Sequence, residues 1–177
     1  MLFSEVPLAD AWVIDIEPVG DQRGFFSRVW CKREFEKLGL KTDLAQANVA
    51  FNEKKGTLRG MHFQCAPYQE VKVVRCTRGA IYDVIVDIRK NSATYGKWYG
   101  VELTQENSRM LYVPEGFAHG YQTLVDKSEI FYMVSEYYTP GSEGGLRWDD
   151  PRFGIEWPEE AHRLISDKDK NWLDFSG

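Results

Sequence analysis

The stretch Thr57-Leu-Arg-Gly-Met-His-Phe-Gln64 places an imidazole three positions after a guanidinium, in a segment that reads as a β-strand. Successive side chains of a strand point to opposite faces, so His62 and Gln64 share one face with Gly60, whereas Met61 and Phe63 share the other. Arg59 falls on the Met61 face unless a bulge at Gly60 turns it around. Taken alone, such a strand is more often structural than catalytic. Whether this one belongs to an active site depends on the residues elsewhere in the chain.

The sequence on both sides of this stretch consists of short strands separated by turn residues. Besides 57–64, strands are predicted at 11–17, 23–30, 44–51, 70–75, 80–88, 98–103, 110–113, 120–123 and 130–138. The gaps between them are too short for the crossover helices of parallel sheets, which predicts an all-β sandwich or barrel. Pro18 and a turn at Gly20-Asp21 are expected to end the first strand. One helix is predicted at 32–38, ended by Gly39, and an irregular tail is expected from Thr139 onward.

Composition narrows the class of protein. The 177 residues are 43% hydrophobic and 28% charged, which predicts one globular domain over residues 1–177 without a linker. A net charge of -5 argues against bulk binding to nucleic acid, although it permits a local cationic pocket for one phosphorylated small molecule. Three cysteines without a close pair, no visible export signal and no membrane-spanning stretch predict a cytoplasmic protein with reduced thiols.

Acid–base chemistry is the best supported of the chemistries that the residues could perform. His62 is a candidate base, Tyr132 a candidate acid and Lys72 a cation within an apolar strand, with His119 as a second imidazole. Each also has a structural interpretation, with Lys72 facing outward and Tyr132 packing in the core.

Metal, nucleophilic and phosphate chemistry have less support. The histidines stand too far apart in sequence for a cluster of ligands, so no metal is predicted. Cys65 and Cys76 have no adjacent histidine and read as core residues. Phosphate could meet Arg23, Arg59 and Lys168, although the chain contains no phosphate-binding glycine motif.

Eight motifs in chain order, spanning about residues 20 to 172, resemble the dTDP-4-dehydrorhamnose 3,5-epimerase family. They are Arg23–Phe26 (RGFF), Leu58–Gln64 (LRGMHFQ), Lys72–Cys76 (KVVRC), Tyr82–Arg89 (YDVIVDIR), Val113–Gly120 (VPEGFAHG), Tyr137–Pro140 (YYTP), Gly154–Pro158 (GIEWP) and Ser166–Asp169 (SDKD). The resemblance implies a cupin-type jelly-roll barrel without metal or cofactor. It also implies a homodimer that exchanges N-terminal strands, and a nucleotide-linked 4-keto-6-deoxy-hexose as substrate.

The same resemblance implies roles for individual residues. His62 would remove the proton beside the C4 carbonyl, Asp169 would pair with His62, and Tyr132 would supply a proton from the opposite face. Lys72 would stabilise the enolate oxygen, and His119 would lie close to the sugar. The positions expected to meet the diphosphate are Arg59 and, from across the dimer, Arg23; those expected to line the nucleotide and sugar pocket are Gln46, Asn48, Tyr138, Glu143 and Lys168.

Two positions depart from the family pattern. Arg28 stands where well-known bacterial members carry Glu, and Met133 stands where many carry Lys. The expected activity is inversion at C3 and C5 of dTDP-4-dehydro-6-deoxy-D-glucose. The alternatives are inversion at C3 or C5 alone on a related nucleotide sugar, a 3,4-ketoisomerase, and a non-catalytic protein that binds a sugar nucleotide.

Overall fold

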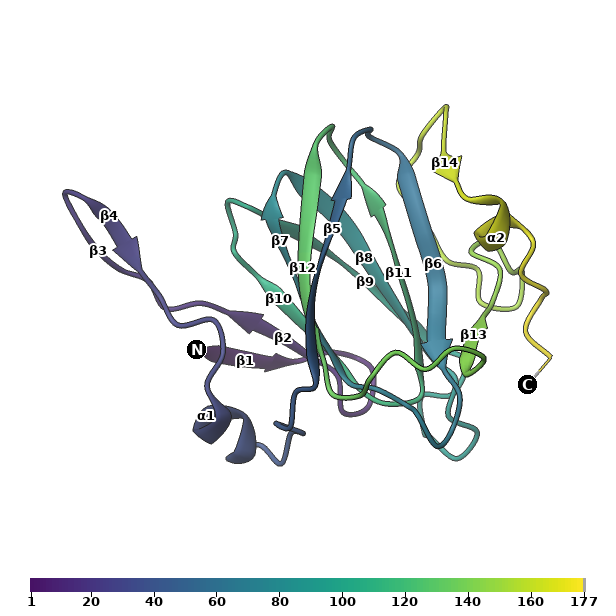
Figure 1. The fold of residues 1–177 in the computed structure, drawn as a ribbon, viewed down its shortest axis with the longest axis horizontal. Coiled ribbons are helices and arrows are strands. Elements are labelled where there is room, and N and C mark those ends of the chain that lie inside the picture. Colours follow the sequence, from purple (N-terminus) through teal and green to yellow (C-terminus); the bar gives the residue numbers. More distant parts are fainter. Residues whose placement is uncertain (177) are drawn as a thin grey trace.

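Two antiparallel sheets packed face to face form the body of the protein (Figure 1). The computed structural model describes residues 1–176, and Gly177, the last residue of the expected domain, lies outside the described residues. The first sheet has the order β1 (Leu2–Glu5), β2 (Trp12–Asp15), β10 (Met110–Val113), β7 (Lys72–Arg78), β12 (Ser128–Val134), β5 (Gln46–Asn52). The second has the order β13 (Glu143–Gly145), β6 (Thr57–Gln64), β11 (Phe117–Thr123), β8 (Ala80–Asp87), β9 (Trp98–Thr104). The predicted all-β sandwich is confirmed.

The remaining elements are short and, apart from one two-residue strand that joins the second sheet, lie outside the two main sheets. They are the hairpin β3 (Val19–Asp21) and β4 (Gly24–Phe26), helix α1 (Lys32–Glu36), strand β14 (Leu164–Ile165), which pairs with the start of β6, and helix α2 (Asp167–Lys170). Neither helix is long enough to cross a membrane, and the described residues contain no other α-helix.

Most predicted strands are present with ends displaced by up to four residues, and the expectations for three segments are wrong. Gly20 and Asp21 belong to β3, because the turn of the hairpin comes later, at residues 21–24. The predicted strand 23–30 is extended only at Gly24–Phe26. The tail expected to be irregular contains β13, β14 and α2, which were too short to show a periodic pattern.

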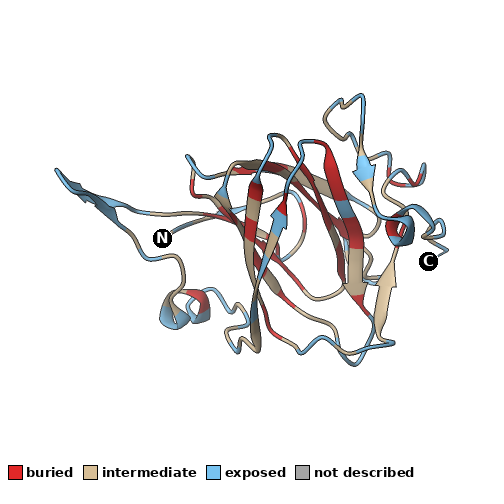
Figure 2. Cartoon of the chain, turned by 45° about the horizontal axis from the view of Figure 1, so that its top comes forward, coloured by how far each residue is buried: buried red, intermediate tan, exposed pale blue. Residues whose placement is uncertain are grey.

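Alternating side chains of the strands build three apolar layers. In β8, Ile81 and Ile85 point into the space between the sheets, whereas Val84 and Val86 point outward, beneath the C-terminal segment. A third cluster covers the outer face of the first sheet, where Phe35 of α1 is fully buried. Because both faces of β8 are covered, its sequence is almost continuously apolar. Figure 2 shows the buried residues concentrated in the strands of the two sheets.

The hairpin of β3 and β4 is an exception to this burial. It extends away from the body of the molecule, and its residues are exposed (Figures 1 and 2). Its apolar side chains Val19, Phe25 and Phe26 are 75%, 64% and 71% exposed. Apolar side chains on such an arm are stabilised only when another surface covers them.

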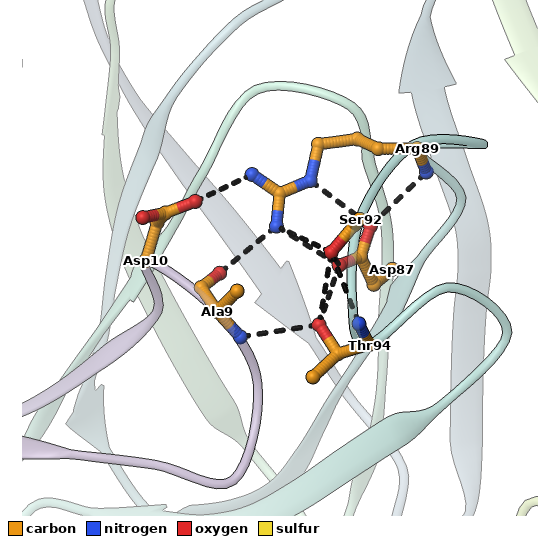
Figure 3. A network of polar contacts seen from close by, with 6 residues as sticks. All are labelled: Ala9, Asp10, Asp87, Arg89, Ser92 and Thr94. Atoms are coloured by element: carbon orange, nitrogen blue, oxygen red, sulfur yellow. Dashed lines mark hydrogen bonds and ion pairs between the residues drawn. The ribbon is translucent and has the colours of Figure 1, made fainter.

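A buried carboxylate ties the N-terminal segment to the end of β8 (Figure 3). Asp87 is fully buried and accepts hydrogen bonds from Arg89 Nε (3.0 Å) and Nη2 (2.9 Å) and from two neighbouring hydroxyls, those of Ser92 and Thr94. Arg89 also donates to the Ala9 carbonyl oxygen (3.0 Å) and to the Asp10 carboxylate (2.7 Å). Burial disfavours the charge on Asp87, but these donors outweigh burial and lower the pKa of its carboxyl group. The network therefore fixes the segment that precedes β2.

Candidate active site

Arg59 and His62 both line a cavity between the two sheets, although they are three positions apart in β6. The register between β6 and β11 shifts between His119 and Tyr121, and Gly60 has a φ of +128°. This irregularity brings Arg59 to the same face of β6 as His62. The strand therefore has the bulge at Gly60 that the sequence required for Arg59 and His62 to share a face. A Cβ atom at Gly60 would lie 2.6 Å from the Cα atom of Gly120, so a glycine is required on steric grounds.

The irregular backbone at Gly60 also allows a carboxylate to bind next to His62. His62 Nε2 lies 2.6 Å from Asp169 Oδ1, and the Gly60 N–H donates to Asp169 Oδ2 at 3.2 Å. The side chain of Ser166 caps α2 by accepting from the Asp169 N–H, which holds the carboxylate in place. If Nε2 donates to Asp169, Nδ1 is the ring nitrogen that can accept a proton.

The pKa of Asp169 reflects this environment. Burial opposes ionisation of the carboxyl group, but the hydrogen bonds and charge of His62 and the Gly60 N–H outweigh burial and lower the pKa. Asp169 is therefore a carboxylate throughout the neutral range, and it can stabilise a positively charged His62.

Two connected cavities meet at His62, Lys72 and Tyr132, which line both of them. The inner cavity has a volume of about 190 Å³ and the outer cavity about 310 Å³. The inner cavity is completed by Ala50, Arg59, His119, Gly120, Tyr121 and Ile130. The outer cavity is completed by Gln46, Asn48, Phe63, Gln64, Glu70, Val134, Tyr138 and Glu143.

Strand parity explains why these side chains meet. Lys72 lies on the same face of β7 as Val74 and Cys76, and Tyr132 lies on the same face of β12 as Ile130. These residues point into the space between the sheets, so the alternative that Lys72 faces outward is excluded. His119 is paired directly with His62 across the ladder between β11 and β6.

Tyr132 faces His62 from the opposite sheet. Its side chain is half-buried, and burial together with the negative charge of Glu70 raises the pKa of the phenol, against an opposing effect of Arg59. The phenol is consequently protonated at neutral pH and can donate a proton.

Three of the expected site residues do not line either cavity. Asp169 lies behind His62, and Lys168 pairs with Glu143 at the outer cavity, which raises the pKa of the lysine. Arg23 is 85% exposed on the hairpin, and among residues 1–176 its side chain pairs only with Asp21 of that hairpin. A single copy of the chain therefore does not bring Arg23 to the cavities.

Two carboxylates of the site were missed by reasoning from sequence. Asp83 is fully buried, and its Oδ1 lies 2.8 Å from His119 Nε2. Glu70 Oε1 lies 2.6 Å from Lys72 Nζ, with both side chains largely buried. The sequence contained a signal for each of them. In the predicted strand 80–88, Asp83 falls on the same face as the apolar Ile81 and Ile85, and in the predicted strand 70–75, Glu70 falls on the same face as Lys72.

The two departures from the family pattern lie outside the cavities. Met133 points to the outer face of the first sheet, where it packs in the apolar cluster that contains Val73. Arg28 is exposed near the base of the hairpin, 4.0 Å from Glu34. Neither side chain contacts the groups at the junction of the cavities.

A larger cleft lies elsewhere, between the N-terminal segment and the loop after α1. It measures about 840 Å³, but both of its cationic side chains are already paired, Lys41 with Glu115 and Arg89 in the network around Asp87. Within residues 1–176, no three His, Cys, Asp or Glu side chains are grouped as a metal site.

Comparison with known proteins identifies the family. Residues 5–177 match the family model described as dTDP-4-dehydrorhamnose 3,5-epimerase. A relative of that name from Sinorhizobium fredii is 44% identical over 171 residues, which cover 97% of this chain and 88% of the relative. The chain belongs to the dTDP-4-dehydrorhamnose 3,5-epimerase family.

Solved structures of the family share the fold. A dTDP-4-dehydrorhamnose 3,5-epimerase from Elizabethkingia anophelis matches with a TM-score of 0.96 and 37% identity, covering 99% of this chain and 96% of that one. One from Bacillus anthracis, with TDP and PPi bound, matches with a TM-score of 0.94 and 40% identity, covering 98% and 99%. The expected cupin-type jelly roll is thereby confirmed.

The fold is shared by an enzyme with a narrower activity. A 3'-monoepimerase from Streptomyces bikiniensis, in complex with dTDP-quinovose, matches with a TM-score of 0.89 and 32% identity, covering 96% of this chain and 85% of that one. Similarity to this epimerase fold therefore leaves the number of inverted carbons to be argued from chemistry.

Proposed function

We propose that this chain is an isomerase that converts dTDP-4-dehydro-6-deoxy-D-glucose to dTDP-4-dehydro-L-rhamnose by inverting C3 and C5. The observation that carries the proposal is the junction of the two cavities. There His62, hydrogen-bonded to Asp169, faces Tyr132 across the space between the sheets, with the Lys72 ammonium beside them. A base and an acid on opposite walls are what an inversion at carbon requires.

Each inversion would proceed in two proton transfers. His62 Nδ1 takes the proton from the carbon beside the C4 carbonyl, and the electron pair of the C–H bond moves into the C4–O group as an enolate. Lys72 supplies a positive charge for that oxygen. Tyr132 then delivers its proton to the other face of the same carbon, which inverts the centre. C3 and C5 both neighbour C4, so the same groups can act on each once His62 has released its proton to water and Tyr132 has regained one from water.

The residues on the two sides of the junction are suited to the nucleotide part of the substrate. Arg59 contributes a guanidinium from the inner cavity, and Arg and Lys side chains are the usual partners of diphosphate oxygens. Gln46, Asn48 and Tyr138 offer amide groups and an aromatic ring, which suit a pyrimidine nucleoside. Because both sheets and the C-terminal segment contribute to the site, we treat the chain as one functional domain.

We propose further that two copies complete each other's sites by exchanging their N-terminal strands. The projecting hairpin supports this, because its apolar side chains are exposed and Arg23 lies on it, outside both cavities. A reciprocal exchange of such arms is a common way to build a symmetric dimer. The partner's arm would then bring a second guanidinium to the diphosphate.

Incubation of the purified protein with dTDP-4-dehydro-6-deoxy-D-glucose in D2O, followed by NMR, tests the proposed reaction. We expect deuterium at both C3 and C5 and formation of the L-sugar. Deuterium at one carbon only would assign the chain to the monoepimerase activity, and no exchange would defeat both assignments. His62→Ala is expected to abolish exchange while TDP affinity stays within about threefold, because the base acts in chemistry more than in binding.

A further inference from the structure

Glu70 is a charged residue in the wall of the outer cavity to which the reaction described above gives no role. It lies two positions before Lys72, just ahead of the start of β7, and both residues line the outer cavity. Glu70 Oε1 is 2.6 Å from Lys72 Nζ, and the two side chains are only 10% and 12% exposed. An ion pair this well buried is costly to form and needs further polar contacts to hold it.

Hydrogen bonds from two neighbouring segments restrain this carboxylate and the backbone beside it. Gln64 Nε2, at the end of β6, lies 3.3 Å from Glu70 Oε2, and it also donates to the backbone carbonyl of Tyr137. The neighbouring Val71 exchanges hydrogen bonds with Ser135, its N–H donating to Ser135 Oγ at 2.9 Å and its carbonyl accepting from the Ser135 N–H. The start of β7 is thus tied to the end of β6 and to the segment after β12.

We propose that Glu70 is a positioning residue of the active site, whose carboxylate holds the Lys72 ammonium at the junction of the two cavities. An unrestrained lysine has four rotatable bonds and would sample many positions in a cavity of this size. Pairing with Glu70 limits the ammonium to a place where it borders both His62 and Tyr132. The inference rests on the proposed function, because Lys72 matters only if negative charge develops beside it.

Glu70 also acts electrostatically on Tyr132. Its negative charge raises the pKa of that phenol, adding to the effect of burial. The other titratable groups that line the cavities with Tyr132 are Arg59, His62, Lys72, His119, Tyr121, Tyr138 and Glu143, and Glu143 is itself paired with Lys168. Removing the Glu70 charge removes the negative charge that raises the pKa of Tyr132, so this pKa should fall and the acid should be lost at a lower pH.

The test compares Glu70→Gln with the wild type, measuring kcat and KM from pH 6 to 11 with the dTDP-4-keto sugar. We expect kcat to fall about 10- to 100-fold with KM changed less than about threefold, since a misplaced group penalises the transition state. The alkaline limb of the kcat profile should move to lower pH. Glu70→Asp keeps the charge and should retain that limb. Glu115→Gln is the matched control, because it removes a carboxylate that pairs with Lys41 at the same 2.6 Å outside both cavities.

A double-mutant cycle with Lys72→Met separates positioning from a general structural effect. If Glu70 acts through Lys72, Glu70→Gln should cost little further kcat in the Lys72→Met background. An equal loss in both backgrounds, an unchanged kcat in Glu70→Gln, or a rise in KM alone would overturn the proposal. Should Glu70→Gln fold poorly, the kinetic comparison is made with Glu70→Asp, which keeps the charge but shortens the side chain that holds Lys72.

A crystal structure of Glu70→Gln gives a result that does not depend on turnover. We expect Lys72 Nζ to leave the junction or to lose its density, and an unmoved Nζ would contradict the inference. A wild-type protein that exchanges no deuterium would instead defeat the proposed function, so the two failures are distinguishable.

Discussion

At the scale of single residues, the proposed chemistry depends on two pairs of side chains, His62 with Asp169 and Lys72 with Glu70. His62 lies 2.6 Å from a carboxylate that comes 107 positions later in the chain. A carboxylate in this position selects the ring tautomer and stabilises the imidazolium that forms when the proton is taken. The role of His62 is therefore inseparable from Asp169.

Asp169→Asn should lower kcat by about 100- to 10,000-fold with little change in KM, because an amide no longer stabilises the charged imidazole. The measurement is steady-state kinetics with the dTDP-4-keto sugar. Asp167→Asn, on the same short helix with its carboxylate 96% exposed, serves as the control and should behave as the wild type. A wild-type kcat in Asp169→Asn would remove Asp169 from the mechanism.

Tyr132→Phe should separate the two proton transfers. Without the phenol, His62 still removes and returns the substrate proton on one face, so deuterium wash-in persists while epimerised product falls about 100-fold or more. Because burial and Glu70 raise the pKa of Tyr132 above its ordinary value near 10, the wild-type profile should lose the acid only above about pH 10. NMR in D2O measures both quantities, and product formed at the wild-type rate would show that another group is the acid.

At the scale of elements, β6 is the strand on which the site is built. Its irregularity at Gly60 turns Arg59 inward and frees an N–H for Asp169, and it requires close approach to Gly120 of β11. One backbone feature therefore both places Arg59 in the cavity and provides the N–H that binds Asp169. A regular strand would do neither.

Gly60→Ala should destabilise the protein by about 2 to 4 kcal/mol, because a Cβ would clash with the backbone of β11 in a conformation that L-residues avoid. Denaturant unfolding measures the loss. Gly96→Ala is the control, since Gly96 also has a positive φ but no atom within 4 Å of an added Cβ. It should cost about 1 kcal/mol. Equal costs at the two positions would refute the steric explanation.

Asp87→Asn should destabilise the fold by about 3 kcal/mol at pH 7, because it leaves Arg89 without its buried partner. The folded-state pKa of Asp87 is lowered, so its contribution to stability is complete above the ordinary carboxyl range. It is lost as the pH falls through the lowered pKa. The difference in unfolding free energy between wild type and variant should thus be constant from pH 5 to 7 and shrink below about pH 4. A difference that does not depend on pH would show that the charge is not involved.

At the scale of the whole molecule, the exposed hairpin separates Arg23 from the cavities of its own chain. A second copy of the chain that packs against the hairpin would bury these exposed apolar side chains. The proposed dimer therefore has a functional consequence that can be tested without a structure of the complex.

Mixing Arg23→Ala with His62→Ala and allowing subunits to exchange should restore activity to about a quarter of the wild-type level. Half of the dimers would be mixed, and each would contain one site with His62 from one copy and Arg23 from the other. A mixture of His62→Ala with Asp169→Asn is the control, because both groups belong to the same wall and no mixed site regains the pair intact. Failure of the first mixture, with both variants dimeric by light scattering, would place Arg23 in its own chain's site or outside any site.

The all-β class and the approximate positions of most strands could be predicted from the sequence. Alternation of apolar residues and turn spacing are local properties, and they located β6 and β10 to the residue. The eight motifs pointed to the family and, through it, to His62, Lys72, Tyr132 and Asp169. The short elements of the C-terminal segment were missed because two to four residues carry no period.

Three features were decided only by the tertiary structure. Arg59 lies on the same face of β6 as His62, Asp83 and Glu70 pair with His119 and Lys72, and Arg23 lies outside the cavities of its own chain. The physical reason is that a strand's pattern specifies two faces but not what lies opposite them. A bulge reverses the face of one residue, as at Arg59. Contacts between residues 36 or 107 positions apart, as in the two His–Asp pairs, exist only once the sheets have packed.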